Sequence, residues 1–205
     1  MGKTGAKKQI KKVEDNLNRK RFSKIFWRSF AGVLFIVFLI FAAISLGWIG
    51  YLPPIDELQN PKNKYATEIY SSDLEVLGRF YYGANRVGVN YSDLPESLVN
   101  ALIATEDVRF YRHSGVDGKA LVRAVAALGR AGGGSTITQQ LAKQLYSGTS
   151  GNIVTRIIQK LNEWVIAVKL ERLYSKEEIL TMYLNQYDFN YDAIGIKSAA
   201  QTYFA

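Results

Sequence analysis

The chain has 205 residues, of which 48% are hydrophobic, and this composition excludes global disorder. It contains no cysteine, so disulfide bonds and thiolate metal sites are excluded. His113 is the single histidine, so Ser-His-Asp catalysis is excluded unless His113 is the histidine of the triad. Carboxylates are therefore the expected acid–base groups, within one domain of ordinary size that carries an appendage.

The net charge of +8 lies in the first 28 residues, which hold ten Lys or Arg against Glu14 and Asp15. The rest of the chain balances sixteen basic against sixteen acidic side chains. A basic block at one end, followed by an apolar run, is typical of a membrane-topology signal rather than of nucleic-acid binding. We therefore expect residues 1–28 to form a cytoplasmic tail and expect no nucleic-acid partner.

An uncharged apolar run extends from Phe30 to Ile49. Its twenty residues suffice, as a helix, to cross a hydrocarbon core of about 30 Å. Aromatic residues suited to the two membrane surfaces flank it: Phe26, Trp27, Trp48 and Tyr51. The alternative, a cleaved signal peptide, has a shorter apolar run and a small-x-small cleavage site. Residues 29–50 are thus predicted to be one membrane-spanning helix, with everything after it outside the cytoplasmic (inner) membrane.

Residues 51–91 are predicted to form a connector and a small β-containing region. Leu52-Pro53-Pro54 stops the preceding helix, and the polar stretch to Lys64 is typical of a short stalk or packed connector. Three short segments rich in aromatic and β-branched residues follow, separated by turns at 71–73 and 83–85. These segments, 67–70, 76–81 and 86–89, predict a hairpin or a three-stranded ribbon.

Residues 92–205 have the pattern of a mainly α domain. A first helix begins near Pro95. Thr136 with Gln139 forms a capping box that opens a helix carrying Ile137, Leu141 and Leu145 on one face, and Ser175 with Glu178 forms another. Between these boxes, residues 156–173 are apolar on nearly every side, which predicts a buried central helix.

Two carboxylate positions could carry chemistry. Glu106 and Asp107 end the first predicted helix beside Phe110, although acidic residues at helix ends commonly just face water. Glu163 stands among apolar residues, and because a buried unpaired carboxylate is costly, it should face a polar cleft or a cation. Lys160 lies one turn earlier, so the alternative is a structural ion pair on a solvated stripe.

A glycine-rich turn, 132–134, opens the helix that starts after Ser135 and Thr136. The first backbone N–H groups of such a helix can face an anion, and Lys143 would reach the same site from the second turn. No Gly-Lys-Ser/Thr follows, so this is not a nucleotide-binding P-loop. By itself the turn indicates a helix cap as readily as a phosphate site.

Five motifs between about Leu94 and Phe204, in order, resemble those of family 51 glycosyltransferases, the polymerising domain of class A penicillin-binding proteins and of monofunctional transferases. The motifs are Glu106-Asp107-x-x-Phe110-x-x-His113-x-Gly115-x-Asp117, Gly133-Gly134-Ser135-Thr136-Ile137-Thr138-Gln139-Gln140-Leu141-Ala142-Lys143, Lys160-x-x-Glu163, Lys176-x-x-Ile179-Leu180-x-x-Tyr183-Leu184-Asn185, and Gly195-x-x-x-Ala199-Ala200-x-x-Tyr203-Phe204.

The resemblance implies a lysozyme-like, mainly α fold that continues past Ala205. It implies an inverting peptidoglycan glycosyltransferase acting on lipid II and the growing glycan strand, at the bilayer and with other cell-wall synthesis proteins as candidate partners. Glu106 would be the general base and Glu163 would act near the departing diphosphate, either by ordering cations or by holding a divalent cation, Mg²⁺ or Mn²⁺. The substrate-binding residues it implies are Asp107, Phe110, His113, Ser135, Thr136, Gln139, Gln140, Lys143, Arg156 and Lys160, with Asp107, Phe110 and His113 mainly in support.

Two residues depart from the family pattern. Gln159 stands where an arginine commonly precedes the lysine of the third motif, and Gln144 replaces a common asparagine. Arg156 is the candidate replacement cation. A lysozyme-like glycan hydrolase and an inactive membrane scaffold remain alternatives, since the fold with a catalytic glutamate also suits glycan cleavage.

Overall fold

The structure is a computed structural model whose description covers residues 3–59, 67–80, 85–127, 133–147, 151–191 and 193–204. The chain forms two compact units, residues 1–48 and 49–205. The predicted connector stretch 60–64, the predicted turn at 83–84, Tyr81 and Gly132 lie outside the described residues.

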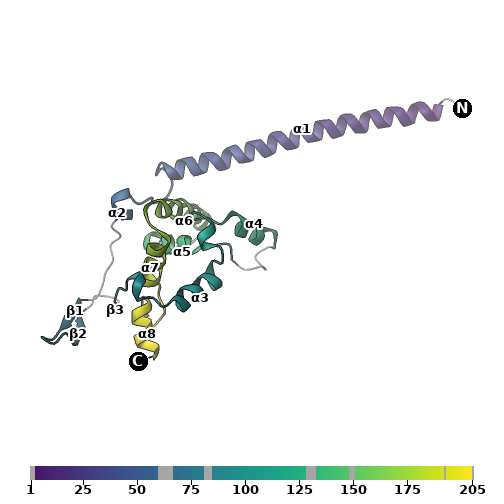
Figure 1. Ribbon diagram of the computed structural model, residues 1–205. Coiled ribbons are helices and arrows are strands. Elements are labelled where there is room, and N and C mark those ends of the chain that lie inside the picture. Colours follow the sequence, from purple (N-terminus) through teal and green to yellow (C-terminus); the bar gives the residue numbers. More distant parts are fainter. Residues whose placement is uncertain are drawn as a thin grey trace. The chain divides into compact units, whose positions relative to one another are not determined.

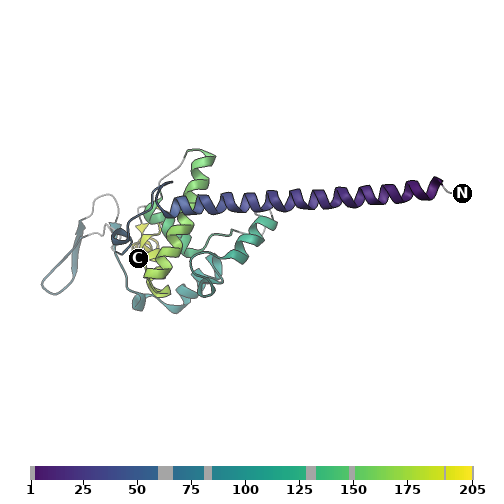
Figure 2. The same ribbon diagram turned by 90° about the horizontal axis from the view of Figure 1, so that it is seen from above.

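The first unit is one continuous helix, α1 (Lys3–Ser45), drawn as a single rod in Figures 1 and 2. Its stretch Arg19–Ser45 is long and apolar enough to cross a membrane. α1 ends at Ser45, well before Pro53 and Pro54, so the prediction that these prolines stop the helix is wrong. Gly47 has φ +75° and donates to the carbonyl of Ile44, while Trp48 donates to that of Ala43. This pattern is a Schellman motif, which needs glycine at the left-handed position.

The described residues of the second unit include four short strands beside the helices. β1 (Thr67–Tyr70) and β2 (Val76–Phe80) pair antiparallel, with a bulge between Ile69 and Tyr70, which confirms the predicted hairpin. The alternative of a three-stranded ribbon is wrong: β3 (Asn85–Arg86) pairs in parallel with β4 (Ala193–Ile194) instead. A partner more than a hundred residues away leaves no trace in the local pattern of the strand.

Helices form the body of the second unit, as the mainly α prediction requires (Figure 1). Those in chain order are α2 (Ile55–Gln59), α3 (Glu96–Glu106), α4 (Gly118–Ala126), α5 (Ile137–Tyr146), α6 (Ile153–Leu173), α7 (Lys176–Gln186) and α8 (Ile196–Phe204), with 3₁₀ turns η1 (Tyr91–Asp93) and η2 (Phe110–Arg112). α5, α6 and α7 pack on one another. Their apolar faces enclose a core that includes Phe110, Ile137, Leu141, Ile166, Leu170, Ile179 and Leu180.

Of the two predicted capping boxes, one is complete and the other is half present, and the predicted central helix is only partly buried. Ser175 and Glu178 form the reciprocal box that opens α7. Thr136 caps α5 by accepting from the N–H of Gln139, but the Gln139 side chain makes no return bond, so the predicted box is only half present. α6 is helical as expected, yet Ile153 and neighbouring apolar residues of its first turns are exposed. Apolar composition predicted the helix but not where burial begins.

The short helix α2 shows that the connector packs on the helical body. The Tyr146 hydroxyl donates to the carbonyl oxygen of Glu57 at 3.2 Å, and the Tyr174 hydroxyl donates to that of Leu58 at 2.6 Å. Leu58 itself is fully buried. Residues 55–59 are therefore a packed connector, the second of the two forms that the sequence allowed.

Gly115 is required where the chain passes α6. Its φ is +92°, and a Cβ there would lie 2.8 Å from the carbonyl carbon and oxygen of Ala167. We expect Gly115→Ala to lower the free energy of unfolding by about 2 kcal/mol or more, because left-handed strain and backbone overlap add. Chemical denaturation measures this. Gly118→Ala, with no atom within 4 Å of the added Cβ, is the control and should not destabilise; equal midpoints for both variants would contradict the packing argument.

Candidate active site

The end of α3 and the start of α5 share a cavity of about 410 Å³. The first and second sequence motifs both contribute to its lining, which includes Glu106, Asp107, Arg109, Asp117, Arg123, Gly133, Gly134, Ser135, Thr136 and Gln140. Residues about 30 positions apart in the chain thus meet in one space, as the two motifs require if they serve one reaction.

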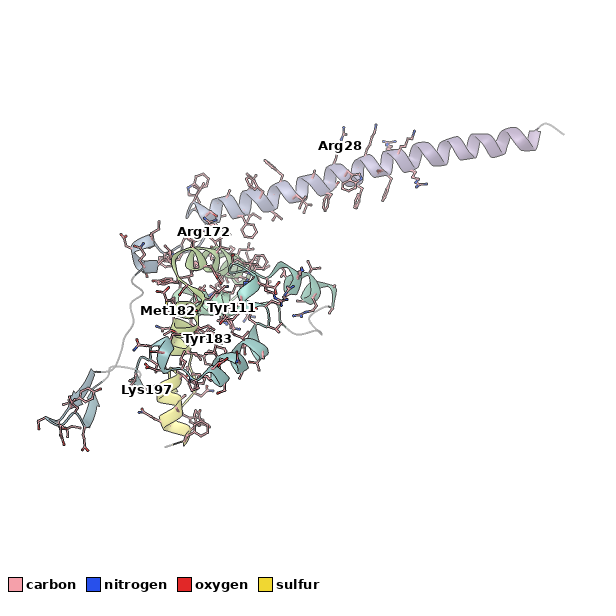
Figure 3. All side chains as sticks on the ribbon, viewed as in Figure 1. Arg28, Tyr111, Arg172, Met182, Tyr183 and Lys197 are labelled. Carbon is pink, nitrogen blue, oxygen red and sulfur yellow. The ribbon has the colours of Figure 1, made fainter. Side chains whose placement is uncertain are left out.

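Glu106 is the last residue of α3 and is exposed to solvent. The amide nitrogen of Gln140 donates to its Oε2 at 2.8 Å, and the hydroxyl of Tyr183 donates to the amide oxygen of Gln140 at 3.1 Å. Burial raises the pKa of Tyr183, and the charge of Glu106 raises it further, so this hydroxyl stays protonated and keeps donating. Tyr183, labelled in Figure 3, therefore fixes which end of the Gln140 amide faces the carboxylate.

Asp107 follows directly but has a different environment. Its carboxylate is buried and contacts His113 Nε2 at 2.9 Å, and it accepts the backbone N–H of Ile137 at 3.2 Å. Phe110 is fully buried and lies edge-on to the His113 ring. These contacts tie the loop after α3 to the first turn of α5. The arrangement suits support of the site rather than proton transfer.

Glu163 and Lys160 form an ion pair on α6. Lys160 Nζ lies 3.0 Å from Glu163 Oε2 and donates to Ser135 Oγ at 2.9 Å. The Glu163 side chain is 5% exposed, whereas that of Lys160 is 40% exposed. The pair is therefore not on a solvated stripe: a buried carboxylate holds a cation against the cavity wall at Ser135.

Lysine supplies the cation that Glu163 holds beside the cavity. The carboxylate of Glu163 faces the ammonium of Lys160. Within the described ranges, no group of three or more His, Cys, Asp or Glu side chains could hold an ion. A divalent cation at Glu163 stays a prediction.

Four other predicted site residues lie apart from the cavity or are otherwise engaged. Thr136 lines it, but its hydroxyl donates to the Gly115 carbonyl at 2.6 Å while capping α5. Gln139 is 1% exposed and does not line the cavity. Lys143 and Arg156 are exposed and do not line the cavity either. Binding roles for Thr136, Gln139, Lys143 and Arg156 stay predictions. Gln159, the departure from the family pattern, lines a separate cavity of about 420 Å³.

Sequence patterns missed Arg109 and the role of Asp117. The Arg109 guanidinium makes a bidentate ion pair with the Asp117 carboxylate, which also accepts the N–H groups of Lys119 and Ala120 at the start of α4. Both residues line the cavity. Arg109 directly precedes η2 and Asp117 directly precedes α4, so no single helix or strand contains both residues and no periodic pattern reveals the pair.

This ion pair predicts a pH dependence of stability. Burial alone would raise the pKa of Asp117, but the N–H of Ala120 and the Arg109 guanidinium outweigh it and hold the pKa below its usual value of 3.8. A lowered pKa stabilises the fold above the unfolded value, and the contribution is lost as pH falls through the folded one. We expect Asp117→Asn to reduce the free energy of unfolding by about 1.5 kcal/mol at neutral pH. In denaturant titrations the difference should shrink as pH falls below 3.8 and through the lower folded-state pKa; a difference that stays constant over this range would contradict the proposed cause.

Comparison with known proteins gives a consistent result. A family model described as transglycosylase matches residues 73–205. Penicillin-binding protein 1A of Neisseria cinerea is 45% identical over 157 residues, 75% of this chain and 19% of the relative. That of Neisseria flavescens is 42% identical over 175 residues, 83% of the chain and 21% of the relative. That of Pseudomonas aeruginosa is 35% identical over 188 residues, 90% and 22% respectively.

The chain spans about a fifth of the length of these curated relatives. The matched region contains every residue of the cavity that Glu106 lines. With the predicted motifs brought together in one helical domain, and a family match over well over half of its length, the chain belongs to the transglycosylase family.

Proposed function

We propose that the protein is a peptidoglycan glycosyltransferase, which polymerises the lipid-linked disaccharide lipid II into glycan strands and releases undecaprenyl diphosphate. The observation that carries the proposal is one cavity lined by both Glu106 and Ser135. Gln140 orients the carboxylate of Glu106, and Ser135 accepts a hydrogen bond from Lys160. Transfer from a diphosphate donor requires a base and a cation: Glu106 lines the cavity, and the Lys160 ammonium, although it does not line the cavity, contacts its wall at Ser135. Membership of the transglycosylase family supports the assignment.

Glu106 is the general base in this proposal. Its carboxylate takes the proton from the 4-hydroxyl of the acceptor sugar while that oxygen attacks the anomeric carbon of the donor. The bond from this carbon to the lipid diphosphate breaks, so the configuration inverts and the diphosphate leaves with the electron pair. A positioned base typically contributes about 10² to 10⁴ in rate. The hydrogen bond from Gln140 sets the direction of the carboxylate before substrate arrives.

Lys160 stabilises the leaving group. Negative charge develops on the phosphate oxygens, and a cation fixed in advance lowers the energy of that state. Glu163 and Ser135 hold the ammonium in place. Glu163 therefore acts by orienting a cation, which is the first of the two roles that the family resemblance leaves open. Lys143 and Arg156 would add charge farther out.

The reaction requires the catalytic unit on the outer face of the cytoplasmic membrane. We infer that residues 1–28 stay in the cytoplasm and that residues from 52 onward lie outside, because Lys and Arg are enriched on the cytoplasmic side of spanning helices. Reporter fusions after Tyr91 decide the topology. An external readout is expected, and a cytoplasmic one would overturn the proposed function.

A glycan hydrolase is the alternative, since a lone glutamate in a lysozyme-like site can also protonate a glycosidic oxygen. Incubating the protein separately with lipid II and with preformed glycan separates the two reactions. We expect chain growth from lipid II and no soluble fragments from the glycan. Fragments without chain growth would assign the site to hydrolysis, and neither product would support a binding role.

A further inference from the structure

A buried ion pair lies across the turn from α6 to α7. Lys176 Nζ donates to Glu171 Oε1 at 2.7 Å, and the Glu171 side chain is 5% exposed against 21% for Lys176. Burying two charges costs most of what their attraction returns, so such a pair is a weak source of net stability. Stability alone does not account for charges at this position. Their other contacts are more informative.

The ammonium of Lys176 also holds the loop that follows Glu106. It donates to the backbone carbonyl of His113 at 2.8 Å and lies 4.2 Å from the centre of the Phe110 ring. A cation over an aromatic face is an attractive contact that strengthens away from water. Lys176 thus contacts both ends of η2, the turn between Phe110 and His113.

Glu171 contacts the start of α5, which lines the cavity together with the loop after α3. Its Oε1 accepts the hydroxyl of Thr138, in the first turn of α5, at 2.6 Å. The same oxygen therefore meets Lys176 and Thr138, so the pair bridges the loop after α3 and the helix that carries Gln140. The Asp107 carboxylate, between His113 and the N–H of Ile137, forms a second bridge between these segments.

We propose that the Glu171–Lys176 pair is a positioning element for the base. It fixes the loop after α3 against the start of α5, so that Glu106 Oε2 meets the amide nitrogen of Gln140. The side chains of the pair contact Phe110, His113 and Thr138, so the pair acts through these residues rather than on substrate. The inference rests on the proposed function, since the property that it controls is the rate of proton transfer. Its loss should lower kcat and leave KM for the lipid-linked donor nearly unchanged.

The test compares three variants of the membrane-anchored protein with the wild type. Lys176→Met keeps the length of the side chain but leaves Glu171 buried without its cation, and we expect this variant to be strongly destabilised for that reason alone. The double variant Glu171→Gln with Lys176→Met contains no unpaired buried charge and decides the question. Arg172→Met is the matched control: it removes a cation on α6 next to Glu171 in sequence, at an exposed position labelled in Figure 3.

For the double variant we expect kcat for glycan polymerisation to fall about tenfold or more, with KM and binding of a non-reacting lipid diphosphate within twofold, because small misplacement of a reacting group costs rate. Arg172→Met should stay within twofold of wild type in every quantity. A folded double variant with wild-type kcat overturns the proposal, as does one that cannot fold, since either result leaves the pair only structural. A wild-type protein that forms no glycan refutes the proposed function instead.

Discussion

Glu106→Gln should abolish most polymerisation, lowering turnover by about 10² or more, while the lipid-linked donor still binds. Glutamine keeps the volume of the side chain and can still meet the Gln140 amide, but it cannot accept a proton. Because Glu106 is exposed at the end of α3, its replacement should not cost the fold. Initial rates of chain growth and equilibrium binding of the donor, measured on the same preparation, separate the two effects.

Glu96→Gln is the matched control for this variant. Glu96 is an exposed glutamate in the first turn of the same helix, so its replacement makes the same change of charge on α3 away from the cavity. Its turnover should stay within twofold of wild type. Near-normal polymerisation by Glu106→Gln would remove Glu106 from the chemistry and leave Asp107 or Glu163 to be tested as the base.

Glu163→Gln should also lower turnover by about 10², but by a different route. The substitution removes the buried charge that holds Lys160 against Ser135, so the ammonium no longer has a fixed position near the leaving diphosphate. The KM for the donor should rise as well, since a misplaced cation weakens the contact with the diphosphate in the ground state too. Turnover measured over a range of donor concentrations, at fixed Mg²⁺, gives both quantities.

A double variant shows whether Glu163 acts through Lys160. Residues that work as one unit have non-additive effects, so adding Lys160→Met to Glu163→Gln should cost little beyond the larger single effect. Independent losses that multiply would contradict the proposed orienting role. A loss of activity in Glu163→Gln that excess Mg²⁺ restores would instead point to metal binding.

Short sequence patterns predicted the helix faces and helix caps that depend only on neighbouring residues. The apolar spacing of Ile137 and Leu141 placed one face of α5 correctly, and the Ser175 box marked the start of α7. Helix ends were harder to locate. Gly47 ends α1 by a backbone motif, although the two prolines downstream appeared to be the stronger stop signal.

Contacts between distant segments lay beyond the sequence pattern. Gln140 reaches Glu106 across 34 positions, and Tyr183 reaches Gln140 across 43. Tyr183 is buried, and its hydroxyl also orients the site, a role that its spacing within α7 does not predict. In the same way Lys160 and Glu163 were predicted to pair, while the contact of Lys160 with Ser135 depends on how α6 packs near the start of α5.

If Glu106 drives glycan growth from a lipid diphosphate donor, glycan linkages and free diphosphate must form together. Lipid II labelled in both the sugar and the lipid allows the glycan linkages and the released undecaprenyl diphosphate to be counted in one reaction. We expect one diphosphate released per linkage by the wild type, and a loss of both products together in Glu106→Gln. Diphosphate release without chain growth by the wild type, or an unchanged yield of both products in Glu106→Gln, would contradict this role of Glu106.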